Sequence, residues 1–195
     1  MVPSGRQRRQ PMRIVSGSLR GRPIRTPAGQ DTRPTSDRAR QAVFNILEHA
    51  SWAPGLEGLR VIDLFAGSGA MGLEALSRGA RTCLFVETSE PALACIRGNL
   101  EAMVAQGRVM RQDATRMPPR PPGEAPFDLA LLDPPYGKGL GEAALASLVS
   151  GGWMAADAIA VLERGAGEAT AAGPGWTLLD QRRYGVAQVC FLRAR

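Results

Sequence analysis

The chain is 195 residues long, 44% of them hydrophobic and 22% charged, with a formal net charge of +6. This size and composition fit one globular α/β domain with a substantial core and exclude two full domains. No apolar run approaches the roughly 20 residues of a membrane span, and the arginine-rich beginning lacks the apolar stretch of a secretory signal. We therefore expect a cytoplasmic protein without a membrane partner. Three scattered cysteines and a single histidine, His49, also argue against a disulfide framework and against a metal site.

The charge is concentrated at one end of the chain. Residues 1–40 contain ten arginines against Asp31 and Asp37, a local charge of +8, whereas residues 41–195 contain fourteen basic and sixteen acidic side chains, a net of −2. A basic segment attached to a nearly neutral body is the charge distribution expected for binding a phosphate backbone. The sequence therefore indicates a nucleic-acid partner.

The first 40 residues divide into three parts. Residues 1–11 contain almost no hydrophobic side chain, so we expect a disordered basic tail, and translation could start at Met1 or at Met12. Residues 12–36 form an expected basic arm, in which apolar and basic residues alternate from 13 to 27 as in a small irregular hairpin. A helical pattern begins at Asp37, where we place the start of the main domain, residues 37–195.

The rest of the chain alternates between apolar strand patterns and helical patterns. We expect strands at residues 61–65, 82–86, 108–110, 127–132 and 158–162, and helices at 72–78, from an N-cap at Ser89 to about 103, and at 142–149. Five prolines within residues 117–126 predict a loop. Two final strands, 176–181 and 186–192, are joined by a turn at 182–185 and must be antiparallel to one another. This alternation predicts a mainly parallel α/β sheet with helices on both faces.

A glycine-rich loop follows the first of these strands. Gly67, Gly69 and Gly72 allow a tight turn and close approach of a ligand to the start of the next helix. Glu87 ends the second strand, where a carboxylate can accept both hydroxyls of a ribose, and Asp113 follows the third strand, where it can accept an adenine amino group. The three features together trace one adenosine along the edge of the sheet. Both NAD and S-adenosylmethionine contain that nucleoside, so these residues do not distinguish them.

The tetrad Asp133-Pro134-Pro135-Tyr136 makes that distinction, because it directly follows the fourth strand. The lone pair of an exocyclic base amine is delocalised into the ring, so methylation needs hydrogen-bond acceptors that favour a pyramidal nitrogen. The Asp133 carboxylate and the Pro134 carbonyl supply two acceptors, Pro135 stiffens the loop, and the Tyr136 ring offers a stacking surface for an extruded base. We therefore assign these four residues as the catalytic set.

Together these segments resemble the class I amino-methyltransferases, and the beginning of the chain is similar to that of the bacterial RsmD family. That family methylates N2 of a guanine in 16S ribosomal RNA. The motifs that carry the resemblance are RIVSG at residues 13–17, LRGR at 19–22, RPTSDR at 33–38, DLFAGSG at 63–69 and the tetrad at 133–136.

The resemblance implies a Rossmann-like fold with a seven-stranded, mostly parallel sheet whose last strand is antiparallel, and helices on both faces. It implies S-adenosyl-L-methionine as the cofactor, S-adenosylhomocysteine as its product, and 16S ribosomal RNA in a partly assembled small ribosomal subunit as the partner of a monomeric enzyme. The expected cofactor-binding residues are Thr35, Asp63, Phe65, Gly67, Ser68, Gly69, Glu87, Asp113 and Ala114. The expected RNA-binding residues are Arg20, Arg22, Arg38 and Arg40.

Three other functions remain open at this point. An adenine-N6 methyltransferase acting on DNA or RNA can carry the same tetrad, so only the N-terminal arm favours guanine. A non-catalytic RNA-binding assembly factor on a methyltransferase fold is a second alternative, against which the intact tetrad and glycine loop argue. A nicotinamide dehydrogenase would need a catalytic His or a Tyr-Lys pair, and neither is visible in the sequence.

Overall fold

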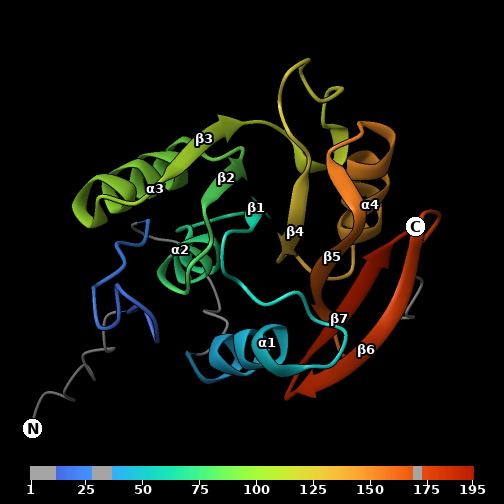
Figure 1. The fold of residues 1–195 in the computed structure, drawn as a ribbon, viewed down its shortest axis with the longest axis horizontal. Coiled ribbons are helices and arrows are strands. Elements are labelled where there is room, and N and C mark those ends of the chain that lie inside the picture. Colours follow the sequence, from blue (N-terminus) through green and yellow to red (C-terminus); the bar gives the residue numbers. More distant parts are fainter. Residues whose placement is uncertain (1–11, 28–36, 169–172) are drawn as a thin grey trace, which may run out of the picture.

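The computed structural model describes residues 12–27, 37–168 and 173–195. Within them, one seven-stranded sheet runs in the order β3-β2-β1-β4-β5-β7-β6 (Figure 1). The strands β3, β2, β1, β4 and β5 are parallel to one another, and β7 is antiparallel to both of its neighbours, β5 and β6. The predicted seven-stranded, mostly parallel sheet with an antiparallel last strand is therefore confirmed. The strands are β1 (Arg60–Leu64), β2 (Thr82–Glu87), β3 (Gly107–Arg111), β4 (Phe127–Leu132), β5 (Met154–Gly165), β6 (Trp176–Tyr184) and β7 (Ala187–Ala194).

Helices cover both faces of the sheet, as predicted. Phe44, Leu73 and Ile96, one from each of three helices, share a hydrophobic cluster with one set of alternating strand residues. Leu145 and Leu148 share a second cluster with the other set. The three helices on the first face are α1 (Asp37–His49), α2 (Ala70–Ser77) and α3 (Glu90–Met103), and the second face carries α4 (Leu140–Ser150) and the short η1 (Ala114–Arg116). None of the helices in the described part of the chain has the length and apolarity needed to cross a bilayer.

The predicted elements all form, and the main difference lies in the last hairpin. The predicted turn at residues 182–185 was wrong, because Arg182, Arg183 and Tyr184 continue β6 and pair with β7. Gly185 adopts a φ of +61°, which allows a two-residue hairpin connection instead of a four-residue one.

Residues 12–27, the described part of the predicted N-terminal arm, fold back on themselves and pack into the main core. Arg13 pairs with Pro23 in an antiparallel bridge, and the N–H of Ile14 donates to the Arg22 carbonyl at 3.0 Å. The side chains of Ile14 and Ile24 are buried in the same cluster as the first three helices. Residues 1–11 of the expected tail and residues 28–36 of the expected arm lie outside the described part of the chain.

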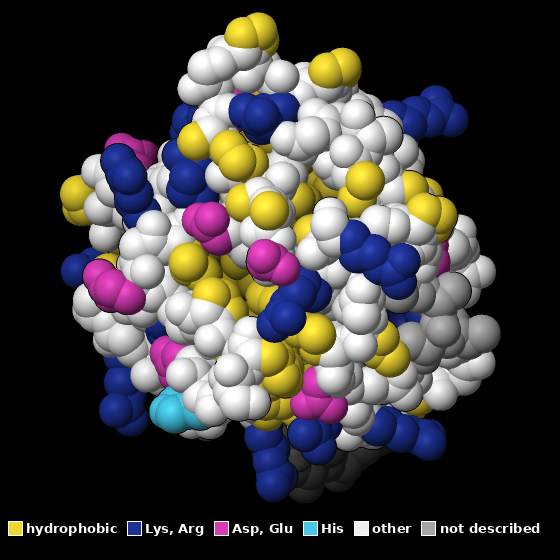
Figure 2. Space-filling model, turned by 45° about the vertical axis from the view of Figure 1, so that its right-hand side comes forward, with side chains coloured by type: hydrophobic (Ala, Val, Ile, Leu, Met, Phe, Trp, Pro, Cys, Tyr) yellow, Lys and Arg dark blue, Asp and Glu magenta, His cyan; other side chains and the backbone are white. Residues whose placement is uncertain are grey.

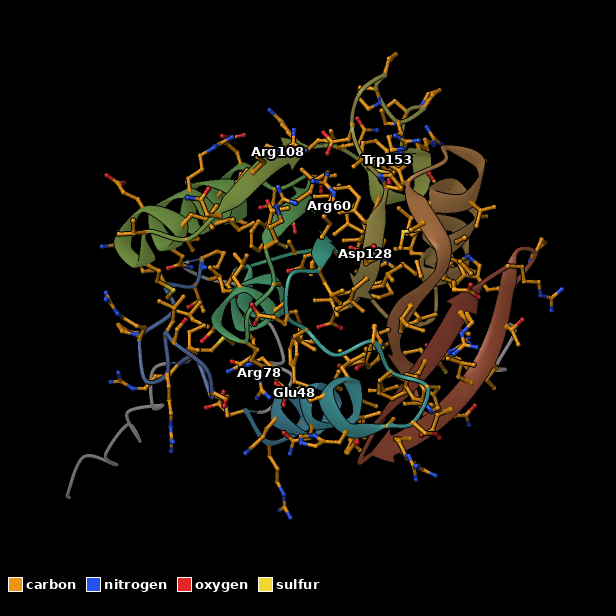
Figure 3. All side chains as sticks on the ribbon, viewed as in Figure 1. Glu48, Arg60, Arg78, Arg108, Asp128 and Trp153 are labelled. Carbon is orange, nitrogen blue, oxygen red and sulfur yellow. The ribbon has the colours of Figure 1, made fainter. Side chains whose placement is uncertain are left out.

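Ion pairs and hydrogen bonds fix the proline-rich loop at the amino end of the sheet. Glu124 accepts from Arg60 and, at 2.6 Å, from Arg108, while the Trp153 indole donates to the Pro118 carbonyl at 2.7 Å. Asp128 accepts the backbone N–H of Arg60 at 2.9 Å. Figure 3 shows the labelled side chains of this network at the same end of the sheet. This end is held by structural contacts, so the opposite, carboxyl end is where loops can form a site.

Candidate active site at the carboxyl edge of the sheet

The strand register brings the sequence-predicted site residues to one edge. Leu64 of β1 pairs with Val86 of β2 on one side and with Leu132 of β4 on the other. The glycine loop, Glu87 and Asp133 each follow one of these paired residues, so they lie at the same level of the sheet. The structure therefore places the predicted nucleoside-binding loop next to the predicted catalytic tetrad.

The glycine loop combines unusual backbone angles with close packing. Gly67 and Gly69 have φ values of +54° and +80°, which residues other than glycine rarely adopt. A Cβ on Gly72 would lie 2.4 Å from Phe85 Cε1 and 2.6 Å from Cys83 Sγ, so only glycine lets α2 pack this closely on β2. Phe65, a predicted cofactor residue, also has a positive φ of 58°, and such strain is typical of functional loops.

Asp63, near the end of β1, holds the end of the glycine loop through a hydrogen bond. Its side chain is 3% exposed, and Oδ2 accepts the backbone N–H of Gly72 at 2.9 Å. Burial raises the pKa of the Asp63 carboxyl well above its usual range, the Gly72 hydrogen bond opposes this rise, and the nearby Asp133 and Glu87 carboxylates add to it. Three acidic side chains therefore lie close together at this edge of the sheet.

We expect Asp63→Asn to be more stable than the wild type at neutral pH, by about 1–2 kcal/mol. The asparagine keeps an acceptor for Gly72 but removes a buried charge. The pKa of Asp63 is higher in the folded state than in the unfolded state. The unfolded state therefore loses its proton first as pH rises, and the free energy of unfolding of the wild type falls between the two pKa values. Urea unfolding of both proteins between pH 4 and pH 8 should show a difference that grows with pH. A difference that is constant over this range would contradict the buried-charge account.

Glu87 is oriented by backbone N–H groups around the glycine loop. Its Oε2 accepts from Gly67 at 2.9 Å, and its Oε1 accepts from Thr88 at 2.7 Å and from Ser89 at 2.9 Å. The predicted N-cap position of Ser89 is confirmed, although its hydroxyl makes no capping bond. The carboxylate is thus held at the end of β2, where the sequence predicted a ribose acceptor.

Asp113 and Ala114 lie where the chain leaves β3. Asp113 Oδ1 accepts from the Thr115 hydroxyl at 2.7 Å and from its backbone N–H at 2.9 Å, and these two bonds lower the pKa of the carboxyl. Asp113 is exposed, whereas Ala114, the first residue of η1, is buried in the second hydrophobic cluster. Asp113 therefore stays ionised as a surface acceptor two strands away from the glycine loop.

Asp133 of the tetrad lines a small pocket on the face of the sheet that α1 covers. Pro134 is buried, Asp133 and Tyr136 are half-buried, and Pro135 is exposed. The Tyr136 hydroxyl donates to Glu163 Oε1 at 2.6 Å. The pocket has apolar walls and two carboxylates, and its lining residues are Val43, Met71, Leu132, Asp133, Val161, Glu163 and Val189. The pocket therefore places two carboxylates, Asp133 and Glu163, side by side among apolar side chains.

Glu163 was not predicted from the sequence. It lies inside the long strand β5, and only the register between β4 and β5 makes it a neighbour of Asp133, since Leu132 pairs with Leu162. A carboxylate at the end of the fifth predicted strand is the signal that could have identified it.

Among the described residues, no three His, Cys, Asp or Glu side chains form a cluster suited to a metal ion.

The predicted RNA contact of Arg40 was wrong, whereas the other three predicted RNA-binding arginines are exposed. Arg20, Arg22 and Arg38 are exposed, but Arg40 is only 1% exposed and is paired with Asp37 at 2.9 Å. Arg40 lies on the buried stripe of α1, three residues before Val43, and the helical spacing in the sequence could have shown this. Figure 2 shows basic side chains mostly toward the margin of one face and hydrophobic ones gathered in its middle. The predicted cofactor residue Thr35 lies outside the described residues.

Comparisons with known proteins agree with this arrangement. The family model of conserved hypothetical protein 95 matches residues 12–193. "Putative rRNA methyltransferase YlbH" of Bacillus subtilis is 40% identical over 128 residues, 64% of this chain and 67% of that protein. "Ribosomal RNA small subunit methyltransferase D" of Haemophilus influenzae is 30% identical over 178 residues, 90% of each chain. The solved structure named "Putative methyltransferase yhhF from Escherichia coli" has a TM-score of 0.80 at 30% identity, and the match covers 95% of this chain and 98% of that one.

Proposed function

The chain belongs to the conserved hypothetical protein 95 family, the RsmD family that its motifs resemble, and from this membership we propose that it methylates N2 of a guanine in 16S ribosomal RNA. The observation that carries the proposal is the position of Asp133-Pro134-Pro135-Tyr136 beside the glycine loop at one edge of the sheet. That arrangement joins a nucleoside-binding loop to the acceptors that amine methylation requires.

The residues at this edge fit S-adenosylmethionine as the cofactor. The glycine loop allows close approach of the ligand, Glu87 can accept the ribose hydroxyls, and Asp113 can accept the adenine amino group. The loops after β1 and β3 also contain Phe65, Ser68 and Ala114. We assign these three residues to cofactor contacts from their position. When bound, S-adenosylmethionine supplies an electrophilic methyl group and leaves as S-adenosylhomocysteine.

The tetrad prepares the amine of the base. The Asp133 carboxylate and the Pro134 carbonyl accept its two hydrogens and favour the pyramidal nitrogen whose lone pair can attack. The amine gains a methyl group and loses one proton, for which the Asp133 carboxylate is the nearest acceptor. The Tyr136 ring stacks on the extruded base and sets its angle, and Pro135 limits the freedom of the loop. Positioning and electrostatics supply most of the rate, so no strong base is needed.

The exposed arginines of the N-terminal hairpin are the proposed contacts to the RNA backbone. Arg20 and Arg22 lie on the hairpin and Arg38 lies at the start of α1, all of them exposed. We propose a partly assembled small subunit as the partner, a monomeric enzyme and a cytoplasmic location, in keeping with the ribosomal RNA substrate in the names of the relatives.

Replacing Arg20 and Arg22 with glutamine should weaken RNA binding and flatten its salt dependence. Each phosphate contact contributes about −0.7 to −0.9 to the slope of log K against log salt concentration, so the loss of two contacts should reduce the magnitude of the slope by roughly 1.4–1.8. Filter binding to small-subunit RNA between 50 and 200 mM salt measures this slope. Replacing two exposed arginines on the last hairpin, Arg182 and Arg183, is the matched control. An unchanged slope in the Arg20 and Arg22 variant would refute the hairpin contact.

The proposed function is tested by mapping methylated small-subunit RNA from cells with and without this gene. We expect one guanine to lose an N2-methyl group in the deletion strain and to regain it when the gene is restored. Loss of an N6-methyladenine would instead support the adenine alternative, and an unchanged methylation pattern would support a non-catalytic assembly factor.

A further inference from the structure

Glu163 is a second carboxylate in the pocket beside the catalytic Asp133. The two residues lie next to one another on adjacent parallel strands, because Leu132 pairs with Leu162. Glu163 also pairs with Val189 of β7, and both side chains line the pocket together with Asp133. The mechanism above gives Glu163 no task, although it is half-buried and lines the same small pocket as Asp133.

The chemistry of guanine gives this carboxylate a role. Next to its N2 amine, guanine carries a hydrogen on ring nitrogen N1, so this edge presents donors side by side. Adenine presents a lone pair at N1 beside its N6 amine. When the N2 amine lies at Asp133, the N1–H lies on the neighbouring position along the same edge. A carboxylate there accepts from guanine and repels the N1 lone pair of adenine.

We propose that Glu163 is the specificity-determining residue for guanine and accepts the N1–H of the target base. The inference rests on the proposed function, and it adds the residue that separates guanine from adenine, which the tetrad does not do. An ionised carboxylate has about four lone-pair positions, so Glu163 can accept a hydrogen from the base as well as from the Tyr136 hydroxyl, which donates to it at 2.6 Å.

The bond to Tyr136 couples recognition to stacking. Tyr136 is the residue assigned to stack on the base, and its hydroxyl holds Glu163 Oε1. The ring that sets the plane of the base therefore also fixes the carboxylate that reads its edge. A polar group that is taken out of water and left without a hydrogen-bond partner raises the free energy of the complex. A base without N1–H would leave Glu163 in that state, so its rejection exceeds the loss of one hydrogen bond.

The test uses small subunits reconstituted from ligated 16S RNA with guanine or 2-aminopurine at the modified position. 2-Aminopurine keeps the amine at position 2 but has a lone pair at N1. For the wild type we expect kcat/KM to be roughly 10–100-fold lower on 2-aminopurine. Glu163→Gln can donate its amide N–H to that lone pair, so its preference should fall to about one or reverse. Glu101→Gln, the same change at an exposed position of α3, should keep the wild-type preference.

The outcomes separate the inference from the function on which it rests. If Glu163 only supports Tyr136, Glu163→Gln will lower both rates by the same factor and leave the preference unchanged, as Tyr136→Phe should, and the inference is then wrong. A wild-type preference within twofold would also overturn it, whatever the variant does. If the wild-type enzyme modifies neither RNA, or yields N6-methyladenine, the proposed function itself fails.

Discussion

Replacing Asp133 with alanine should reduce turnover by at least about 10²–10³-fold, while S-adenosylmethionine affinity stays within roughly tenfold, or about 1.4 kcal/mol. Asp133 lies after β4 in the tetrad, and the proposed cofactor contacts come from the loops after β1, β2 and β3. The substitution therefore removes an acceptor that acts on the amine of the base and leaves the residues assigned to the nucleoside in place.

Two measurements on the Asp133→Ala protein check this expectation. Methyl transfer under single-turnover conditions reports the chemical step, and calorimetry reports cofactor binding. Asp157→Asn is a suitable control, because Asp157 is an exposed residue of β5 with a φ of +60°, which asparagine tolerates. Near-normal transfer by Asp133→Ala would show that the acceptor role is wrong, and equal losses of binding and transfer would indicate a general disturbance of the site.

Replacing Glu74 with glutamine should cost about 3–5 kcal/mol of unfolding free energy, the largest stability effect that we expect from any conservative change. Glu74 is fully buried in α2 and accepts the backbone N–H groups of Val15 at 2.8 Å and Ser16 at 3.0 Å. It also pairs with Arg78 at 2.9 Å and with the buried Arg40 at 3.6 Å. A glutamine supplies one acceptor oxygen where donors face both carboxylate oxygens. It also removes the buried counter-charge shared by Arg40 and Arg78, which keep only their more exposed partners Asp37 and Glu48.

Urea unfolding measures the loss, and Glu48→Gln is the matched control. Glu48 pairs with the other side of Arg78 at 2.9 Å but is 29% exposed, so its replacement should cost less than about 1 kcal/mol (Figure 3). Hydrogen exchange should show that Glu74→Gln also loosens residues 12–27, because their backbone is held by that carboxylate. A loss below 1 kcal/mol for Glu74→Gln would contradict the anchoring role.

The parts of the site that could be predicted from sequence are those set by local chemistry. The glycine loop and the tetrad each directly follow a strand, so their position depends only on recognising that strand and its direction. Asp133 and Glu87 could be placed for the same reason. The alternation of strands and helices was enough to predict the parallel sheet, since each connecting segment crosses from one edge to the other.

The parts that could not be predicted depend on contacts between distant segments. Glu163 belongs to the site only through the pairing of β4 with β5 and through the bond from Tyr136. The hairpin at residues 12–27 is positioned by Glu74 of α2 and by Asn99 of α3, which accepts the Arg25 N–H at 2.9 Å. The family resemblance implied an RNA contact for Arg40, whereas its position on the apolar stripe of α1 buries it.

The most direct test of the account is nucleoside analysis after the purified protein has acted on unmethylated small subunits with methyl-labelled S-adenosylmethionine. Digestion to nucleosides followed by mass spectrometry identifies the labelled base without reference to any relative. We predict label in N2-methylguanosine alone, at one position of 16S RNA. Label in N6-methyladenosine, or none with fully active cofactor and intact subunits, would contradict the account.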